Sequence, residues 1–308
     1  MTAIVIGIDG GGSKTTAVVA DDQGNAVAEL SGAPSAVRAG SVDASADVIA
    51  GVARDALAAA GADALPRVVC VGVAGVGRES LRLELWEALA SREIADEVVV
   101  HTDFAVAFDD AFAQGPGILL LAGTGSVAMG RGPTGAMARC GGWGPDIGDE
   151  GGGAWIGRRA LSIVAAAADG REPGTALTGA VLTAAECAEV TDLIGWAADA
   201  SPATLATLAP VVFHVADAGD LRANALLDLA TEELALHARA LARQLFTDER
   251  AAVPIALSGG LLGARMPLRK RLTHRLKSAV PGAAVSHDEV VPARGAVRGA
   301  LRVLGNAV

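Results

Sequence analysis

The stretch IVIGIDGGGSKTTAVVA (residues 4–20) joins two hydrophobic runs through a turn of three glycines. ILLLAGTGSVAMG (118–130) repeats this arrangement in the middle of the chain, and PIALSGGLLG (254–263) adds a glycine turn near the end. Glycine lets a backbone approach a phosphate closely, and the unpaired amide groups of such a turn form an anion site. Two strand–turn–strand units and a third turn therefore predict two halves that close on one nucleotide.

The spacing of the first turn excludes two common phosphate-binding motifs. A P-loop needs a lysine directly after its last glycine, whereas Ser13 separates Gly12 from Lys14. The dinucleotide-binding fingerprint needs a third spaced glycine and a following helix, whereas another β-rich run, TTAVVADD, follows here. A tight hairpin without a ligand is the remaining alternative. Three glycines beside Asp9 exceed what a hairpin needs, so phosphate binding is favoured.

Composition and charge narrow the classes of partner. At 308 residues the chain is long enough for two domains, and no apolar run reaches the length of a membrane helix. The first residues enter a strand without the features of a signal peptide, which predicts a soluble, cytoplasmic protein. A formal charge of −10 argues against nucleic acid or an anionic membrane as partner. The one basic cluster has the spacing of a solvated helix face: Arg265, Arg269, Lys270, Arg271, Arg275 and Lys277.

Cysteines and histidines are too scattered to form a metal site by sequence spacing. The three cysteines, Cys70, Cys140 and Cys187, are odd in number and far apart, which suits reduced thiols. No pair of histidines has the spacing of metal ligands. Any metal is therefore expected to arrive with a nucleotide. The histidines are His101, His214, His237, His274 and His287.

Hydrophobic periodicity predicts the same order of elements in both halves. The first half reads as strand, glycine turn and β-meander (4–10 and 15–30), helix (43–61), strand (68–75), helix (79–91) and strand (97–103). The pattern restarts after 114–117 and has a mostly helical insertion over about 153–248, in which one long helix buries Leu226, Ala230, Leu234, Ala238, Leu241 and Leu245. The chain finishes with strands near 254 and 283 and a helix over 293–304.

Repeated βββαβα units with a nucleotide between them are typical of the ribonuclease-H-like fold of the actin, Hsp70 and sugar-kinase superfamily. The fold class is therefore α/β, with two ribonuclease-H-like domains of the actin or hexokinase type and a nucleotide cleft between them. The expected domains are 1–114 and 115–308, with the alternative that helix 293–304 packs back on the first.

Seven motifs follow one another in the order of a known family: GIDGGGSKT, HTDFAVA, ILLLAGTGS, CGGWGPDIGDEGGGAWIGR, TLATLAPVVFHVADAGD, IALSGGLL and PARGAVRGAL. The chain resembles the BadF/BadG/BcrA/BcrD ATPase family, and within it the N-acetylglucosamine kinase branch. The segment CGGWG…GDEGG is the most specific part of the match. The resemblance implies ATP and Mg²⁺ as cofactors and an amino sugar as substrate.

Phosphoryl transfer needs donors for the phosphates, a carboxylate near Mg²⁺ and a base for the acceptor hydroxyl. Asp9 is placed to hold Mg²⁺ through water, with an Asx-turn cap as the alternative. Gly259 and Gly260 are expected to contact adenosine, although a plain strand-to-helix turn would look the same. The predicted phosphate-binding residues are Gly11, Gly12, Ser13, Lys14 and Thr15 in the first domain and Thr124, Gly125 and Ser126 in the second.

Asp103 is the predicted general base and a sugar-binding residue. It ends a strand and opens DFAVAFDDAFA, so its carboxylate is expected at the sheet edge where ligands bind. The resemblance assigns this position the deprotonation of the 6-hydroxyl of the sugar. A helix N-cap is the alternative role for this aspartate. Asp109 and Asp110 further along the same helix are expected to be solvated.

Residues 140–153 combine seven glycines with a tryptophan and three acids, which is costly to order and unlike an ordinary connector. Paired hydrogen bonds from carboxylates are a common way to bind sugar hydroxyls. For Cys140, burial as a small apolar side chain is as plausible as contact with a ligand. For Asp146 and Glu150, the alternative to ligand binding is capping of the helix that starts near Gly153. The resemblance carries sugar contacts over to Cys140, Gly142, Trp143 and Asp149.

One position departs from the family pattern. Kinases of this branch usually carry a sugar-binding asparagine in the early loop, whereas SGAPSAVRAG has Ala36 there, near Ser35 and Arg38. Loss of an amide that pairs with buried hydroxyls lowers affinity or redirects specificity. The identity of the sugar therefore does not follow from the sequence.

Three functions are compatible with these motifs. The first is an ATP-dependent kinase for N-acetylglucosamine or glucosamine, expected from the family to be a homodimer. The second is an ATPase that activates a 2-hydroxyacyl-CoA dehydratase or benzoyl-CoA reductase through an iron–sulfur cluster, whose cysteine ligands are hard to find here. The third is a catalytically silent nucleotide or sugar sensor. Asp9 and Asp103 favour the kinase.

Overall fold

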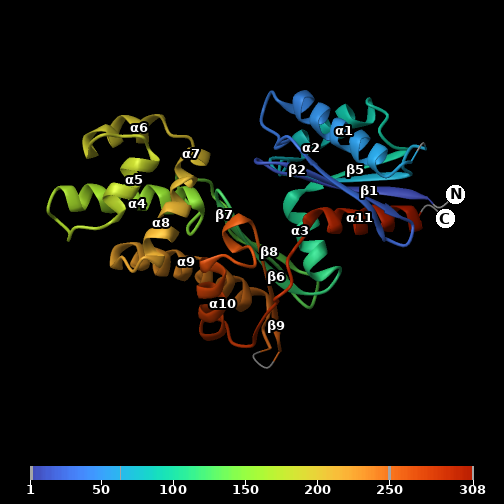
Figure 1. Cartoon of the computed structure of the whole chain (residues 1–308). Helices are drawn as coiled ribbons and strands as arrows, with labels where there is room; N and C mark the ends of the chain where they lie inside the picture. The colour runs from blue at the N-terminus through green and yellow to red at the C-terminus, as the bar shows by residue number, and fades with distance from the viewer. Residues whose placement is uncertain (1–2, 63, 249–250, 307–308) are drawn as a thin grey trace. The chain divides into compact units, whose positions relative to one another are not determined.

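The computed structural model describes residues 3–62, 64–248 and 251–306. These residues form two compact units, each built on its own sheet (Figure 1). The first unit contains the described residues up to Gln114 together with those from Val290 onward, and the second contains Gly115–Glu289. The helix at the end of the chain thus belongs with the first unit, the packing that the sequence analysis held as an alternative.

The first unit has a five-stranded sheet in the order β3-β2-β1-β4-β5, in which β1, β2 and β3 are antiparallel and β4 and β5 run parallel to β1. Its strands are β1 (Ile4–Gly10), β2 (Thr15–Asp21), β3 (Ala26–Gly32), β4 (Val68–Val73) and β5 (Glu97–Thr102). Its helices are α1 (Val42–Ala59), α2 (Glu79–Ala90), α3 (Asp103–Phe112) and α11 (Pro292–Asn306).

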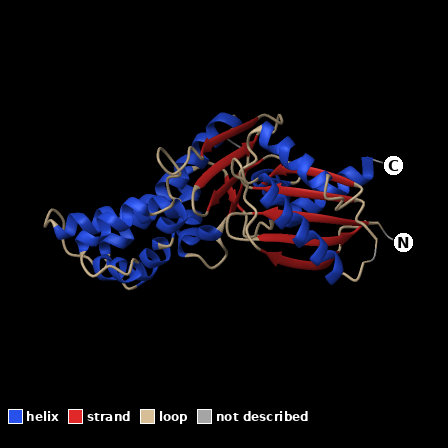
Figure 2. Cartoon of the chain, turned by 90° about the horizontal axis from the view of Figure 1, so that it is seen from above, coloured by secondary structure: helices blue, strands red, loops and turns tan. Residues whose placement is uncertain are grey.

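Helices cover both faces of this first sheet (Figure 2). One apolar cluster joins the strands to α1 and α2, and a second joins them to α3 and α11. Two glycines allow close approach on the second face. A Cβ on Gly7 would clash with the backbone of α11, and a Cβ on Gly72 would clash with Val106 of α3. Strand β4 is a continuous apolar run because it is buried on both faces, and β2 is likewise buried from Thr15 to Ala20.

The second unit repeats the same sheet, in the order β10-β9-β6-β7-β8. Its strands are β6 (Gly117–Ala122), β7 (Ser126–Arg131), β8 (Met137–Gly141), β9 (Val253–Ser258) and β10 (Ala283–Val285). Its α-helices are α4 (Gly153–Ala168), α5 (Leu177–Ala184), α6 (Leu193–Asp199), α7 (Pro202–Ala206), α8 (Leu208–Asp217), α9 (Leu221–Leu245) and α10 (Pro267–Ala279), with 3₁₀ turns at Val190–Asp192 and Gly260–Leu262. The two matching sheets confirm the predicted fold class.

Helix α9 is the central helix of the second unit, because it contacts β6, β7 and β8 as well as α4, α8 and α10. Asp220 caps its N-terminus by accepting hydrogen bonds from the amides of Arg222 and Ala223, both at 2.9 Å. The apolar stripe predicted for this helix is buried from Leu226 to Leu241, and Leu245 is half-buried.

The prediction that Asp109 and Asp110 are solvated is wrong. Both are buried on α3, and the side chain of Asp110 is only 1% exposed. Arg294 of α11 donates to both carboxylate oxygens of Asp110, at 2.9 and 2.8 Å, and Arg302 pairs with Asp109 at 2.8 Å. The last helix of the chain supplies the charges that make this burial tolerable.

The basic cluster on α10 is also not a simple solvated face. Arg269 is buried and donates hydrogen bonds to the carbonyl oxygens of Leu257, Leu262, Ser286 and Asp288. Arg271 and Arg275 form ion pairs with Asp228 and Glu232 of α9. These arginines fasten α10 to its neighbours.

In the described part of the chain, every helix is too short or too polar to cross a membrane.

Candidate active site

The first glycine turn closes β1 against β2 and leaves its tip exposed. The amide of Gly11 donates to the carbonyl oxygen of Lys14 at 2.9 Å, and Gly12, Ser13 and Lys14 are exposed. A Cβ on Gly12 would meet open space. The tip therefore has room for a ligand beside its backbone.

The hydroxyl of Thr15, one of the predicted phosphate-binding residues, is bonded inside the protein. Thr15 is fully buried, and its Oγ1 donates to the carbonyl oxygen of Ala33 at 2.6 Å and to Ser35 Oγ at 2.7 Å. The hydroxyl ties the loop after β3 to the glycine turn.

Ala36 lies beside the glycine turn. The amides of Ser35 and Ala36 both donate to the carbonyl oxygen of Gly11, at 3.1 and 3.2 Å. The position where the family pattern has an asparagine is therefore one hydrogen bond away from the predicted phosphate site. Ala36 offers no polar side chain there.

Asp9 and Asp103 are two neighbouring carboxylates of the first unit. Burial and the charge of Asp103 raise the pKa of Asp9 to about 6, opposed by Lys14. Burial also raises the pKa of Asp103, although its Oδ1 accepts a hydrogen bond from the Phe104 amide at 2.8 Å. Asp9 comes from β1 and Asp103 opens α3 directly after β5. Residues far apart in sequence thus supply two acids with raised pKa values at one edge of the sheet.

The capping role considered for Asp103 belongs to its neighbour. Thr102 is the N-cap of α3, and its Oγ1 accepts a hydrogen bond from the Ala105 amide at 3.1 Å. Asp103 is the first helical residue, where a carboxylate also meets the positive end of the helix dipole.

The donor set around Asp9 fits a hard divalent cation. No described residue donates a hydrogen bond to the Asp9 carboxylate, and a second carboxylate lies close enough to raise its pKa. Mg²⁺ prefers oxygen ligands, keeps several waters and binds through one or two carboxylates plus substrate phosphates. Within residues 3–62, 64–248 and 251–306, no three His, Cys, Asp or Glu side chains gather into a dedicated metal cage.

In the second unit, the second glycine turn and the glycine-rich loop meet. A Cβ on Gly125 would clash with the carboxylate of Asp149, and the Gly153 amide donates to the carbonyl oxygen of Gly123 at 2.8 Å. Ser126 is buried, and its Oγ donates to the carbonyl oxygen of Glu150 at 2.6 Å. The Ser126 hydroxyl, like that of Thr15, points into the protein and bonds to a loop. Thr124 is exposed at the tip.

The glycine-rich loop holds Asp149 in an unusual conformation. Its φ is +57°, in the left-handed region that non-glycine residues rarely adopt, and its Oδ1 accepts a hydrogen bond from the Gly144 amide at 3.1 Å. Burial is the main cause that raises its pKa. Gly142 also has a positive φ, and Trp143 is 66% exposed with the Arg139 guanidinium 5.0 Å from its ring centre. Strain of this kind collects at binding sites.

The other predicted residues of this unit have simpler surroundings. Cys140 ends up half-buried on β8, and burial raises the pKa of its thiol. Gly259 has a φ of +94° and leaves no room for a Cβ against Ala122, whereas Gly260 is exposed with open space around it. The helix after the loop begins at Gly153 with Gly152 as its N-cap and no side-chain cap, so the capping alternative for Asp146 and Glu150 is wrong.

Sequence reasoning missed His237 on α9. Its ring packs against Gly141, and its Nε2 lies 3.6 Å from Glu150 Oε2. A usable signal existed, because His237 stands three residues after Leu234 and four before Leu241, on the stripe predicted to be buried.

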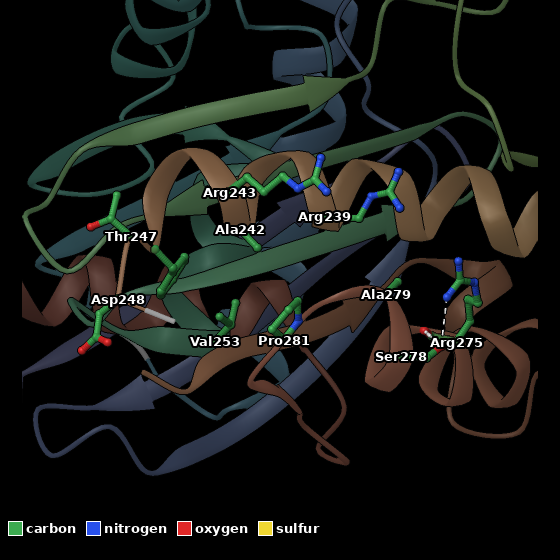
Figure 3. Close-up of a pocket in the computed structure, with 11 residues that line it drawn as sticks. Arg239, Ala242, Arg243, Thr247, Asp248, Val253, Arg275, Ser278, Ala279 and Pro281 are labelled. Carbon is green, nitrogen blue, oxygen red and sulfur yellow. Dashed lines mark hydrogen bonds between the residues drawn. The ribbon is translucent and has the colours of Figure 1, made fainter. Parts of the chain in front are cut away.

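The described residues of the second unit line at least three cavities, of which one, of about 920 Å³, lies between α9 and α10 beside Asp228 and Arg271. Another, of about 540 Å³, adjoins the glycine-rich loop and is lined by Pro145, Ile147, Glu150, Trp155 and Arg158, among others. Figure 3 shows the third, of about 600 Å³, where Arg239 and Arg243 project from α9 and Arg275 from α10. The lining of this third cavity includes none of the predicted site residues.

Comparison with known proteins finds related sequences over nearly the whole chain. The model of the BadF/BadG/BcrA/BcrD ATPase family matches residues 6–301. The N-acetyl-D-glucosamine kinase of Dictyostelium discoideum is 30% identical and covers 95% of this chain and 96% of its own. The N-acetylmuramic acid/N-acetylglucosamine kinase of Clostridium acetobutylicum is 29% identical over 84% of this chain and 85% of its own.

Solved structures are also similar to this chain over nearly its whole length. A Chromobacterium violaceum protein provisionally described as an N-acetylglucosamine kinase superposes with a TM-score of 0.81 at 30% identity, covering 96% of this chain and 98% of that one. A ROK family glucokinase from Streptomyces griseus, solved with glucose and AMPPNP, has a TM-score of 0.61 at 20% identity over 97% and 100% of the two chains. The second likeness concerns the fold alone.

Proposed function

Because this chain belongs to the BadF/BadG/BcrA/BcrD ATPase family, we propose that it is an ATP-dependent kinase that phosphorylates the 6-hydroxyl of an amino sugar, N-acetylglucosamine or glucosamine. The observation that carries the proposal is the placement of Asp9 at the end of β1 and Asp103 directly after β5, close enough for the charge of Asp103 to act on Asp9, which provides one metal-facing and one proton-accepting carboxylate. Homology to N-acetylglucosamine kinases at about 30% identity supports the substrate class.

Asp103 is the general base in this proposal. A base works best when its pKa lies near the working pH, and burial moves the pKa of Asp103 in that direction. One of its oxygens is held by the Phe104 amide, which fixes the orientation of the carboxylate. The other oxygen accepts the proton of the sugar hydroxyl as the oxygen of that hydroxyl attacks the γ-phosphorus of ATP, the bond from the γ-phosphorus to the β,γ-bridging oxygen breaks, and ADP leaves. Positioning and charge neutralisation then supply most of the rate.

The glycine turns are the proposed phosphate sites, with the exposed backbone of Gly12 and Ser13, beside Gly11, in one unit and with Thr124 and Gly125 in the other. Lys14 adds a positive charge at the first turn, and Gly259 and Gly260 are proposed for the adenosine. Asp9 would hold Mg²⁺ through water, and the ion would neutralise charge on the β- and γ-phosphates. Thr15 and Ser126 support these turns through their buried hydroxyls.

The loop from Gly141 to Glu150 is the proposed sugar site. The Asp149 carboxylate is fixed by the Gly144 amide, so it can accept paired hydrogen bonds from sugar hydroxyls at little entropic cost. Gly142 and the backbone of Trp143 complete the contacts, and Cys140 lies at the start of the loop. We further propose that the protein works as a homodimer.

The cysteines speak against the iron–sulfur alternative. Cys70 is buried in the apolar cluster between the first sheet and α11, where Gly299 packs against its sulfur. In the other unit Cys140 lies on β8, whereas Cys187 lies in the loop after α5. A cluster-bound protein would be coloured when purified, so a colourless preparation is expected.

The test is Mg²⁺-dependent ADP release from ATP with glucosamine, N-acetylglucosamine, glucose, N-acetylmannosamine or no sugar. We expect release that depends on one amino sugar and falls by a factor of about 10²–10⁴ in Asp103→Asn. Asp55→Asn, an exposed carboxylate on α1, is the matched control and should retain activity. ADP release at the same rate with and without sugar, or no ADP release at all, would overturn the proposal.

A further inference from the structure

His237 is a buried imidazole beneath the proposed sugar loop, and neither the motifs nor the proposed chemistry accounts for it. The residue is only 9% exposed. A Cβ on Gly141 would lie 2.9 to 3.2 Å from three atoms of its ring. No hydrogen bond to its Nδ1 is found among the residues that the structure describes. Buried polar atoms without partners are rare and costly, so a residue of this kind calls for a function.

The ring of His237 is neutral near pH 7. Burial lowers its pKa, and this outweighs the opposing charges of Glu150, Glu233 and Asp149. A neutral imidazole carries one proton, and the carboxylate of Glu150 at 3.6 Å from Nε2 favours that nitrogen as the donor. His237 therefore directs a polar N–H toward Glu150 from the interior of the unit.

Helix α9 thus holds both ends of the loop. At the start of the loop, His237 packs against Gly141, whose φ of +73° leaves it no side chain. At the end, a Cβ on Gly151 would lie 2.6 Å from Leu234 Cγ on the same helix. Between these points the carbonyl oxygen of Glu150 is held by Ser126, while its carboxylate faces His237. Asp149 stands directly between Gly148 and Glu150 in this loop, so it lies within the segment that α9 contacts at both ends.

We propose that His237 is a positioning residue for sugar binding, which acts through Gly141 and Glu150. It keeps the turn at Gly141 and Gly142 and the strained backbone of Asp149 in the arrangement that accepts the sugar. The inference rests on the proposed function, because it takes the loop as the sugar site. It adds a residue that touches the loop from beneath and does not contact the reacting groups.

Four variants separate positioning from packing. His237→Phe keeps a ring of similar size against Gly141 but removes both nitrogens, and His237→Gln restores a donor at about the reach of Nε2. Glu150→Gln and the double variant His237→Phe/Glu150→Gln test the coupling between the two residues. His214→Phe is the control, because His214 is exposed on α8 in the same unit.

We expect His237→Phe to raise the KM for the sugar by about tenfold while the KM for ATP stays within about twofold of wild type. His237→Gln should recover most of the loss. The double variant should be no worse than His237→Phe alone, because both changes remove the same contact. An equal rise in the KM for sugar and for ATP, or additive effects on the sugar KM in the double variant, would overturn the inference.

Amide hydrogen exchange in the absence of sugar gives a second readout that does not need activity. His237→Phe should speed exchange in residues 141–150 and leave β6 and β7 as protected as in wild type. If the wild type releases no ADP with any sugar, the proposed function fails while this measurement still tests the positioning of the loop. Unchanged exchange in the loop would overturn the inference whatever the activity.

Discussion

At the scale of single residues, the chemistry depends on two half-buried carboxylates that hold protons more tightly than free aspartates do. Asp9 has a pKa of about 6 because burial penalises its charge and Asp103 repels it. Asp103 follows the same rule of burial. Both groups must ionise for the proposed reaction, so the rate should rise with pH through the range in which the pair titrates.

Asp9→Asn tests this pair through stability. A carboxyl whose folded pKa is raised keeps its proton in the folded state while the unfolded chain has already lost it. The wild type therefore loses stability as the pH rises from about 4 to about 6, and the neutral amide does not. The free energy of unfolding of Asp9→Asn relative to wild type should increase by about 2 kcal/mol between about pH 4 and pH 7, measured by urea denaturation.

Asp55→Asn, a substitution at an exposed position of α1, is measured in parallel as the reference. A relative stability of Asp9→Asn that is flat with pH would mean that Asp9 is not buried near Asp103.

At the scale of elements, α3 carries Asp103 at its first residue and is fixed at its other end by α11. Arg294 and the Val291 amide both donate to the Asp110 carboxylate, and Gly295 lets the two helices meet backbone to backbone. The position of the proposed base is thus set partly by a helix almost two hundred residues later in the chain, as the 184-residue separation of Arg294 and Asp110 shows. This is why Asp110 is buried at all.

Asp110→Asn should destabilise the first unit by about 2–3 kcal/mol, because charge-assisted hydrogen bonds to a buried carboxylate are lost while its arginine partners keep their charge. Asp55→Asn should change stability by less than about 0.5 kcal/mol. Chemical denaturation of the two variants measures the difference. Equal stabilities would show that the Asp110 carboxylate contributes nothing to the packing of α3 on α11.

At the scale of the whole molecule, the two units share one sheet order, but they are assembled differently from the chain. The second unit is one continuous segment, and the first is closed by residues from both ends. Helix α11 covers an apolar cluster that includes Val5, Val18 and Cys70 of the first sheet. Without it, that face of the sheet would meet water.

A chain that ends at Glu289 should therefore lose the first unit and keep the second. Hydrogen exchange should become fast in β1 and β4 while β6 and β9 remain protected, because the second unit contains all of its own core. Protection retained in both units would show that α11 is dispensable for the first.

Short-range sequence patterns determined the helices and strands of this chain and its α/β fold class. Alternating and continuous apolar runs predicted the strands, glycines marked the turns, and the apolar stripe of α9 was correct from Leu226 to Leu241. These signals are short-range, because hydrophobic period and turn chemistry act within a few residues. The family motifs added the resemblance that the sequence comparisons then confirmed. The roles of Asp9, Asp103 and the glycine-rich loop remain predictions.

Tertiary structure alone decided the partners of the polar residues. Asp109 and Asp110 were predicted to be solvated, but the arginines of α11 pair with them. Arg269 was predicted to lie on a solvated helix face, but it is buried and donates to four carbonyl oxygens. The hydroxyl of Thr15 bonds to Ser35 inside the protein. His237 is the same case, since its meaning lies in Gly141 and Glu150 about ninety residues earlier. A polar side chain is satisfied by whatever the fold brings beside it, and spacing along the chain carries no record of that neighbour.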